Sequence, residues 1–165
     1  MVEKKVLVDA LRFSYNGPFD VIEFYKFVED WIREHGMEKE IKKKLEHVTS
    51  TGKKIEWFIE CWNQVANYAK SVVRVRALFN NVQEIEVVKD GSKRKLNTGD
   101  VLIIFDGFLE TDLEARWQQK PMYYFLRALV DKYIYKFWTE KWDEHVRKDT
   151  YDMHSSLKEF FELYR

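Results

Sequence analysis

Four carboxylates recur at even spacing in the second half of the chain, at Asp106, Glu110, Asp112 and Glu114. Residues an even number of positions apart lie on one face of a continuous strand, so these side chains would face the same way. Oxygen ligands held like this suit a hard cation such as Mg²⁺ or Ca²⁺, and paired carboxylates suit acid–base chemistry. A solvated strand end that faces Lys and Arg is the simpler interpretation. Asp106, Glu110 and Asp112 are therefore candidate ligands only, and we predict neither a metal nor a catalytic site.

A second pattern alternates acidic and aromatic residues on one strand face: Glu56, Phe58, Glu60 and Trp62. Such a face suits the wall of a polar pocket. It equally suits a half-exposed sheet surface stabilised by cross-strand pairs. Because Arg74 and Arg76 follow on the next expected strand, ion pairing is the simpler of the two interpretations.

Basic residues gather on the same part of the chain. The candidates for contact with nucleic acid are Lys42, Lys43, Lys44, Lys53, Lys54, Arg74 and Arg76. With Trp57 or Trp62 beside them, phosphate contacts and base stacking would suit single-stranded RNA. However, 28 basic residues balance 28 acidic ones, and lysines on exposed strands also block edge pairing. RNA or ribosome association is thus an alternative that the sequence does not favour.

Near its C-terminus the chain has an apolar stripe at helical spacing. The candidate interface residues on it are Trp142, Val146, Met153, Leu157, Phe160 and Tyr164. Part of such a stripe would cover the sheet, and any remainder would contact a protein partner or a second copy. We therefore expect a homo-oligomer, most simply a homodimer.

Familiar catalytic signatures are missing from the sequence, including phosphate-binding glycine loops, CxxC, HExxH and GxSxG. The single cysteine, Cys61, excludes an intrachain disulfide and favours a reducing compartment. The first residues lack the apolar core of a signal peptide, and the strongly apolar run 101–105 is too short to cross a bilayer. We expect a cytoplasmic protein with no cofactor and no membrane association.

The elements that carry these residues follow from the periodicity. Asp20 is placed to cap a helix that ends near Gly36. Alternation predicts strands at 4–15, 37–48, 55–62, 69–79, 82–89, 93–96 and 101–108. Asn16-Gly17-Pro18 and Asn80-Asn81 are expected to be turns, and Asp90-Gly91 the centre of a hairpin.

An apolar helical pattern runs from Pro121 towards the C-terminus, as one helix or as two separated near 148–156. The sequence thus predicts a single α+β domain over residues 1–165. It has an antiparallel sheet of five to seven strands, one helix after the first strand, and long or paired C-terminal helices packed on the sheet.

Several short runs resemble a family of small archaeal proteins of unknown function. They are Tyr15-Asn16-Gly17-Pro18-Phe19-Asp20, Trp31-Ile32, Val87-Val88-Lys89-Asp90-Gly91, Leu96-Asn97-Thr98-Gly99, Asp112-Leu113-Glu114-Ala115-Arg116-Trp117 and Phe125-Leu126-Arg127. The resemblance covers nearly the whole chain and implies an archaeal-type cytoplasmic origin, with no activity attached. The element order also resembles, more loosely, the helix-grip (START/Bet v 1-like) topology, which implies an apolar ligand between the sheet and the C-terminal helix.

Taken together, these patterns favour a non-enzymatic binding or assembly module that acts through a sheet face and the C-terminal helices. The first alternative is a carrier of a small apolar ligand, held between the sheet and the C-terminal helix. Its candidate pocket residues are Trp57, Phe58, Trp62, Phe125, Leu129 and Tyr133. The second alternative is the RNA- or ribosome-associated protein that uses the lysine-rich hairpin.

Overall fold

This computed structural model describes residues 2–112 and 135–165 of the chain. Within these ranges the elements are, in chain order, β1 (Val2–Phe19), α1 (Val21–Glu34), β2 (Glu38–Thr49), β3 (Gly52–Ala66), β4 (Ala69–Lys89), β5 (Ser92–Asp112) and α4 (Tyr135–Glu162). The predicted helical pattern from Pro121 lies outside the described residues until Tyr135.

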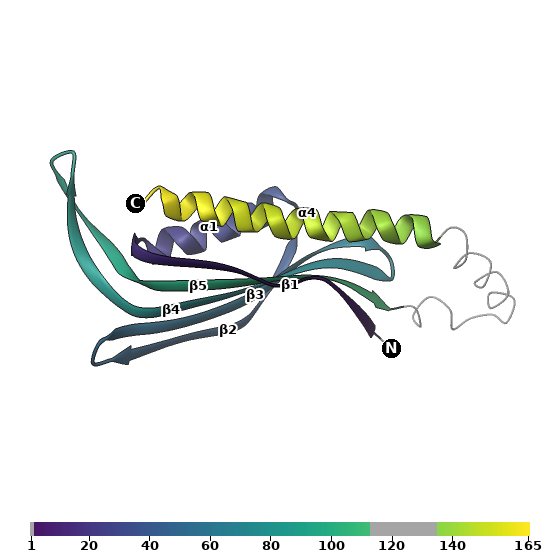
Figure 1. Cartoon of the computed structure of the whole chain (residues 1–165), viewed down its shortest axis with the longest axis horizontal. Helices are drawn as coiled ribbons and strands as arrows, with labels where there is room; N and C mark the ends of the chain where they lie inside the picture. The colour runs from purple at the N-terminus through teal and green to yellow at the C-terminus, as the bar shows by residue number, and fades with distance from the viewer. Residues whose placement is uncertain (1, 113–134) are drawn as a thin grey trace, which may run out of the picture.

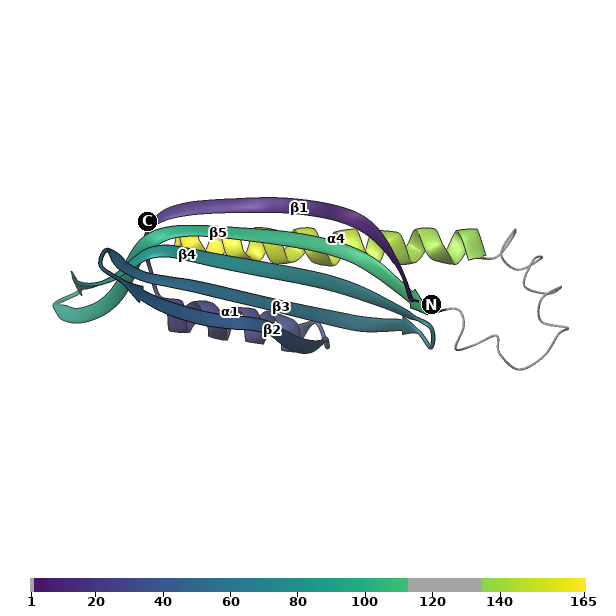
Figure 2. The ribbon, with the colours of Figure 1, turned by 90° about the horizontal axis from the view of Figure 1, so that it is seen from below.

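The five strands form one antiparallel sheet with the order β1-β5-β4-β3-β2. Both helices lie on the same face of this sheet (Figure 1), and seen from below the strands lie in front of them (Figure 2). We call the helix side the covered face and the other side the open face. The protein thus has the predicted α+β fold, with a five-stranded antiparallel sheet, one helix after the first strand and a C-terminal helix.

Two predicted turns are wrong, because the strands continue through them. Asn16, Gly17 and Pro18 remain paired with β5, and the edge position of β1 leaves room for a proline, which cannot donate a ladder hydrogen bond. Asn80 and Asn81 belong to β4, where Asn81 takes a left-handed backbone (φ 54°) at a bulge. Each irregularity is absorbed within a strand and does not end it.

Helix α1 begins and ends as its sequence predicts. The Asp20 carboxylate accepts hydrogen bonds from the backbone N–H groups of Ile22 (3.0 Å) and Glu23 (3.2 Å). Gly36 follows the helix with φ 61°, the left-handed conformation that commonly ends a helix. One face of α1 is apolar and packs towards the core. Tyr25 on this face is half-buried, and its other apolar residues are buried: Val21, Phe24, Val28, Trp31 and Ile32.

Helix α4 is continuous over its described length, so no break occurs near 148–156. It packs on the covered face, where Met153, Leu157 and Phe161 join the core. Gly107 of β5 allows a close approach, since a Cβ atom there would lie 2.2 Å from Thr150 Oγ1. The covered face is therefore closed by direct contact between the helix and the strand backbone.

Candidate functional site

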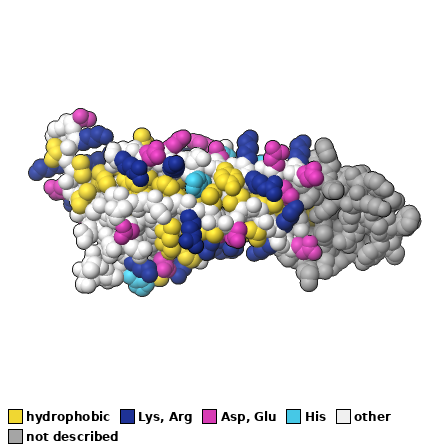
Figure 3. Space-filling model, viewed as in Figure 1, with side chains coloured by type: hydrophobic (Ala, Val, Ile, Leu, Met, Phe, Trp, Pro, Cys, Tyr) yellow, Lys and Arg dark blue, Asp and Glu magenta, His cyan; other side chains and the backbone are white. Residues whose placement is uncertain are grey.

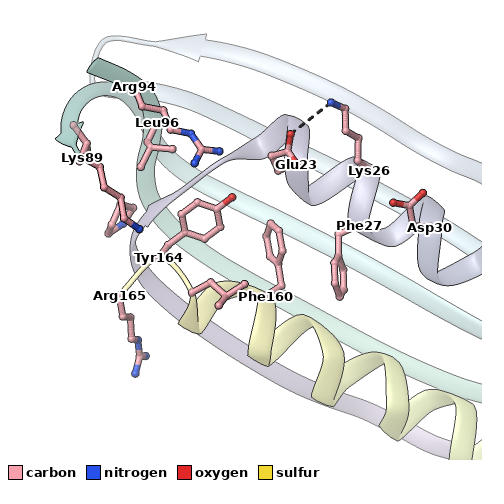
Figure 4. Close-up of a pocket in the computed structure, with 13 residues that line it drawn as sticks. Glu23, Lys26, Phe27, Asp30, Lys89, Arg94, Leu96, Phe160, Tyr164 and Arg165 are labelled. Atoms are coloured by element: carbon pink, nitrogen blue, oxygen red, sulfur yellow. Dashed lines mark hydrogen bonds and ion pairs between the residues drawn. The ribbon is translucent and has the colours of Figure 1, made fainter. Parts of the chain in front are cut away.

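A cavity of about 630 Å³ lies at the end of the molecule where α1, the end of α4 and the β4–β5 hairpin meet (Figure 4). We call it the end cavity. Its lining comes from segments that are far apart in the sequence: Pro18, Glu23, Lys26, Phe27, Asp30, Val87, Lys89, Arg94, Leu96, Phe160, Leu163, Tyr164 and Arg165. Ligand pockets of roughly 300–1,000 Å³ typically hold small organic molecules, so the volume fits such a ligand.

The hairpin reaches the helices because the sheet bends where Gly52 and Gly99 lie close to the backbone of β4. We call residues 83–98, the hairpin beyond the bulge, the arm. At the bend, a Cβ on Gly99 would lie 2.8 Å from the Asn80 carbonyl oxygen, and one on Gly52 would lie 2.9 Å from that of Val82. The backbones thus approach too closely for side chains, and the arm turns up towards the helix side of the sheet (Figure 1).

Strand alternation then decides which arm residues face the cavity. Val87 pairs with Arg94, and Lys89 with Ser92, so Val87, Lys89, Arg94 and Leu96 share one face of the arm. All four line the cavity, whereas Val88 points away and is 67% exposed. The arm base is tied to the start of α1, because the Asn97 side-chain oxygen accepts a hydrogen bond from the Val21 N–H (3.2 Å).

Aromatic rings form the apolar wall of the cavity. The ring centroids of Phe27 and Phe160 lie 5.1 Å apart, and those of Phe160 and Tyr164 lie 5.4 Å apart. Leu163 adds a strongly exposed apolar side chain beside them. In Figure 3, which views the sheet nearly edge-on, hydrophobic side chains lie next to Lys and Arg side chains at the end of the molecule that carries the arm. The wall can therefore bury the apolar part of a ligand that reaches the surface.

The structure separates the predicted pocket residues. Trp57 is buried in the core on the covered face, whereas Phe58 and Trp62 are half-buried on the open face. Phe125, Leu129 and Tyr133 lie outside the described residues. Phe58 and Trp62 therefore cannot line one pocket together with Trp57.

Of the four predicted carboxylates, Asp106 makes hydrogen bonds within the sheet. The Asp106 carboxylate accepts hydrogen bonds from the Ala10 N–H (2.8 Å) and from Arg76 Nη2 (2.8 Å). Ala10 has φ 51° at a bulge of β1 opposite Asp106, so this carboxylate serves a backbone donor that the bulge leaves free. Glu110 is half-buried on the open face, and the Asp112 side chain lies outside the described part. In that part, no cluster of three or more His, Cys, Asp or Glu residues could hold a metal.

The predicted basic residues mostly meet acidic ones. Among the described residues, the ion pairs include Lys42–Glu60, Lys43–Glu56, Lys53–Glu46, Lys54–Glu56 and Arg74–Glu60, while Arg76 pairs with Asp106. Lys44 lies over the Tyr25 ring (5.0 Å to its centroid). These acidic partners reduce the local positive charge that would attract phosphates.

The C-terminal stripe is largely used inside the chain. Val146, Met153, Leu157 and Phe160 are buried, and Trp142 and Tyr164 are half-buried. Trp142 contacts the Tyr68 ring, with 5.9 Å between centroids. Most of this stripe covers the sheet of its own chain.

Cys61 of β3 and Asp149 of α4 are both buried titratable residues. Burial raises the pKa of the Cys61 thiol to about 12, with Asp149 and Glu60 adding to the effect, so the thiol is not an activated nucleophile. Burial also raises the pKa of Asp149, although His145 and His35 oppose the shift. Asp149 Oδ2 lies 3.2 Å from His145 Nε2, and it has no hydrogen-bond partner among the described residues.

The end cavity was not predicted from the sequence. The sequence does contain one indication of it. Val87 and Lys89 are two positions apart, as are Arg94 and Leu96, so each pair places an apolar and a basic side chain on one face of the arm. Only the bend brings that face to the helices.

Comparisons of this chain with models of known protein families, with curated proteins and with solved structures find no match. Among its described residues, no helix has both the length and the hydrophobicity needed to cross a bilayer.

Proposed function

We propose that this protein is a non-enzymatic binding module that holds a small molecule with an apolar body in the end cavity. One observation carries the proposal: a cavity of about 630 Å³ with Phe27, Phe160 and Tyr164 along its wall. Aromatic walls bury large apolar areas, and each buried Å² of apolar surface contributes about 25 cal/mol. A helix-grip-like carrier remains a proposal, and the two helices on one face of an antiparallel sheet support it.

Native mass spectrometry of gently purified protein tests this function. We expect an added mass of a few hundred daltons that is lost on denaturation. Val87→Gln should lower the fraction that carries the added mass, because Val87 lines the cavity. Val88→Gln is the matched control, since this neighbour has the same side chain on the opposite face of the arm. Protein that carries no added mass and binds neither dodecanol nor dodecanoate would contradict the proposal.

A second candidate function, self-association, is favoured by the open face. Half-buried apolar side chains lie together there at Phe58, Leu78, Leu102 and Ile104, and neither described helix covers them. Charged residues of both signs surround them, which suits pairing with a second copy. We expect a dimer that Leu102→Glu shifts to monomer, whereas Val48→Glu, at an exposed edge position, leaves it unchanged. A wild-type monomer at high concentration would rule out this interface.

A further inference from the structure

The charges around the end cavity are unequally partnered. Both of its acidic side chains already pair with a base of α1: Glu23 with Lys26 (3.5 Å) and Asp30 with Arg33. Lys89, in contrast, has no ion pair within the described part of the chain, although it lines the cavity. An unneutralised cation therefore remains on the arm side of the cavity.

Arg94 adds a second cation on the same side. Its Nη2 lies 3.8 Å from Asp20 Oδ2, a long ion pair, while the other oxygen of Asp20 caps α1. The five donors of a guanidinium exceed what this one contact uses, so Arg94 keeps hydrogen bonds to offer. In Figure 4, Lys89 and Arg94 both extend from the arm towards Tyr164, whereas Arg165 points away.

Tyr164 completes this group with a neutral donor. Burial raises the pKa of its hydroxyl, and the nearby Asp20 carboxylate raises it further, although Arg94 acts in the opposite direction. The hydroxyl therefore keeps its proton at neutral pH and can donate it in a hydrogen bond. The same ring contacts Phe160, so the polar group adjoins the apolar wall.

We propose that the ligand is an amphipathic organic anion whose carboxylate or phosphate head binds Lys89, Arg94 and Tyr164, with its apolar body along Phe27 and Phe160. This inference rests on the proposed function and adds the chemical class of the ligand. Two cations and a hydroxyl donor give an anionic head charge-assisted hydrogen bonds, which are stronger than those between neutral groups. The adjoining aromatic wall accounts for the apolar body.

Three probes with the same apolar chain separate the contributions: dodecanoate, dodecyl phosphate and dodecanol. Each is titrated calorimetrically at neutral pH, the two anions below their critical micelle concentrations and the alcohol below its solubility limit. We expect at least one of the anions to bind about tenfold or more tightly than the alcohol, because only the anions gain charge-assisted contacts. The relative affinity of the two anions then shows which head group the site prefers.

Variants locate the head group. Lys89→Gln and Arg94→Gln should each weaken binding of the anion about tenfold and leave the affinity for dodecanol nearly unchanged. Lys93→Gln is the matched control, since this substitution removes the same charge from the same arm and Lys93 does not line the cavity. A loss of the same size in Lys93→Gln would overturn the assignment, because it would show only a general effect of net charge.

The outcomes distinguish the two proposals. If dodecanol binds as tightly as both anions, and Val87→Gln weakens all three probes, the anionic class is wrong and the proposed function stands. If none of the probes binds and the purified protein carries no added mass, both proposals are wrong. Tighter anion binding that depends on Lys89 and Arg94 supports both.

Discussion

The two faces of the sheet are built from the same strands and are stabilised in different ways. On the covered face, β3 buries Ile55, Trp57, Ile59 and Cys61 beneath the helices. On the open face, the alternate residues of the same strand are half-buried and make ion pairs, such as the two hydrogen bonds from Arg74 to Glu60 (3.0 and 2.7 Å). One face depends on apolar packing, and the other depends on cross-strand register.

This difference shows why the charged residues of the open face pair mainly with one another. Glu60 lies opposite Arg74, and Arg74 lies opposite Asp106, so acids and bases alternate across three strands. Neighbouring opposite charges stabilise the register and neutralise each other. Lys89 on the arm differs from these residues, because it lines the end cavity and has no ion pair with another described residue.

The largest difference between the two sides of the sheet should appear when one phenylalanine on each side is replaced by alanine. Phe161→Ala should lower the free energy of unfolding by about 3–5 kcal/mol, because Phe161 is fully buried among rings that include Phe24 and Tyr15. Phe58→Ala, on the open face, should cost only about 1 kcal/mol, since its ring is half-buried. Urea unfolding of both variants measures the difference. Equal losses would contradict the comparison.

An intermediate effect is expected at Asp106, the buried carboxylate of the open face. Asp106→Ala should cost about 2–3 kcal/mol, because it leaves the Ala10 N–H and part of Arg76 without an acceptor. Thermal unfolding measures the loss. Asp106→Asn keeps an acceptor and should recover part of it, and a variant as stable as the wild type would show that water replaces the carboxylate.

A smaller effect should follow from the more exposed ion pair. Glu60→Gln should cost about 0.5–1 kcal/mol, since Arg74 remains partly solvated. High salt should reduce the difference from the wild type. A cost as large as that of Asp106→Ala would mean that the open face is far less solvated than its side chains indicate.

The smallest effect should be a gain in stability, at Asp149 of α4, the helix that packs on the covered face. Burial raises the pKa of Asp149 above its usual 3.8, so the folded state binds this proton more tightly than the unfolded state does. The associated stability is complete below the unfolded pKa and is lost as the pH rises through the folded pKa. Asp149→Asn should therefore raise the melting temperature slightly at pH 7 and flatten its decline above pH 4. A lower melting temperature at pH 7 would indicate that the charged form is needed there.

The sequence predicts the features that depend on local chemistry. Asp20 caps α1, and Gly36 follows the end of that helix with a positive φ. Asp90 and Gly91 take the positive φ values (53° and 77°) that a two-residue hairpin turn requires. The alternation from Ile55 to Cys61 likewise gives the buried face of β3.

The end cavity depends on distant parts of the chain, and local patterns do not reveal it. Asn81 resembles a turn residue by its type, and only pairing on both sides keeps it within β4. The bend that follows brings Val87 and Arg94 against α1 and the end of α4. No periodicity within 83–98 encodes the direction of that bend.

The strand order also has a consequence for the sequence of folding events. β4 and β5 are joined by a two-residue turn and pair from Lys89–Ser92 to Ala69–Thr111. Their pairing can therefore begin with local contacts at the turn and extend along the hairpin. In the described ranges β1 pairs with β5 alone, for example Val2 with Asp112, so it must wait until the β4–β5 hairpin exists. During synthesis on a ribosome, β1 would therefore emerge first but would join the sheet only after β5 had been made. In pulsed hydrogen exchange, protection should accordingly appear in residues 69–111 before it appears in 2–19.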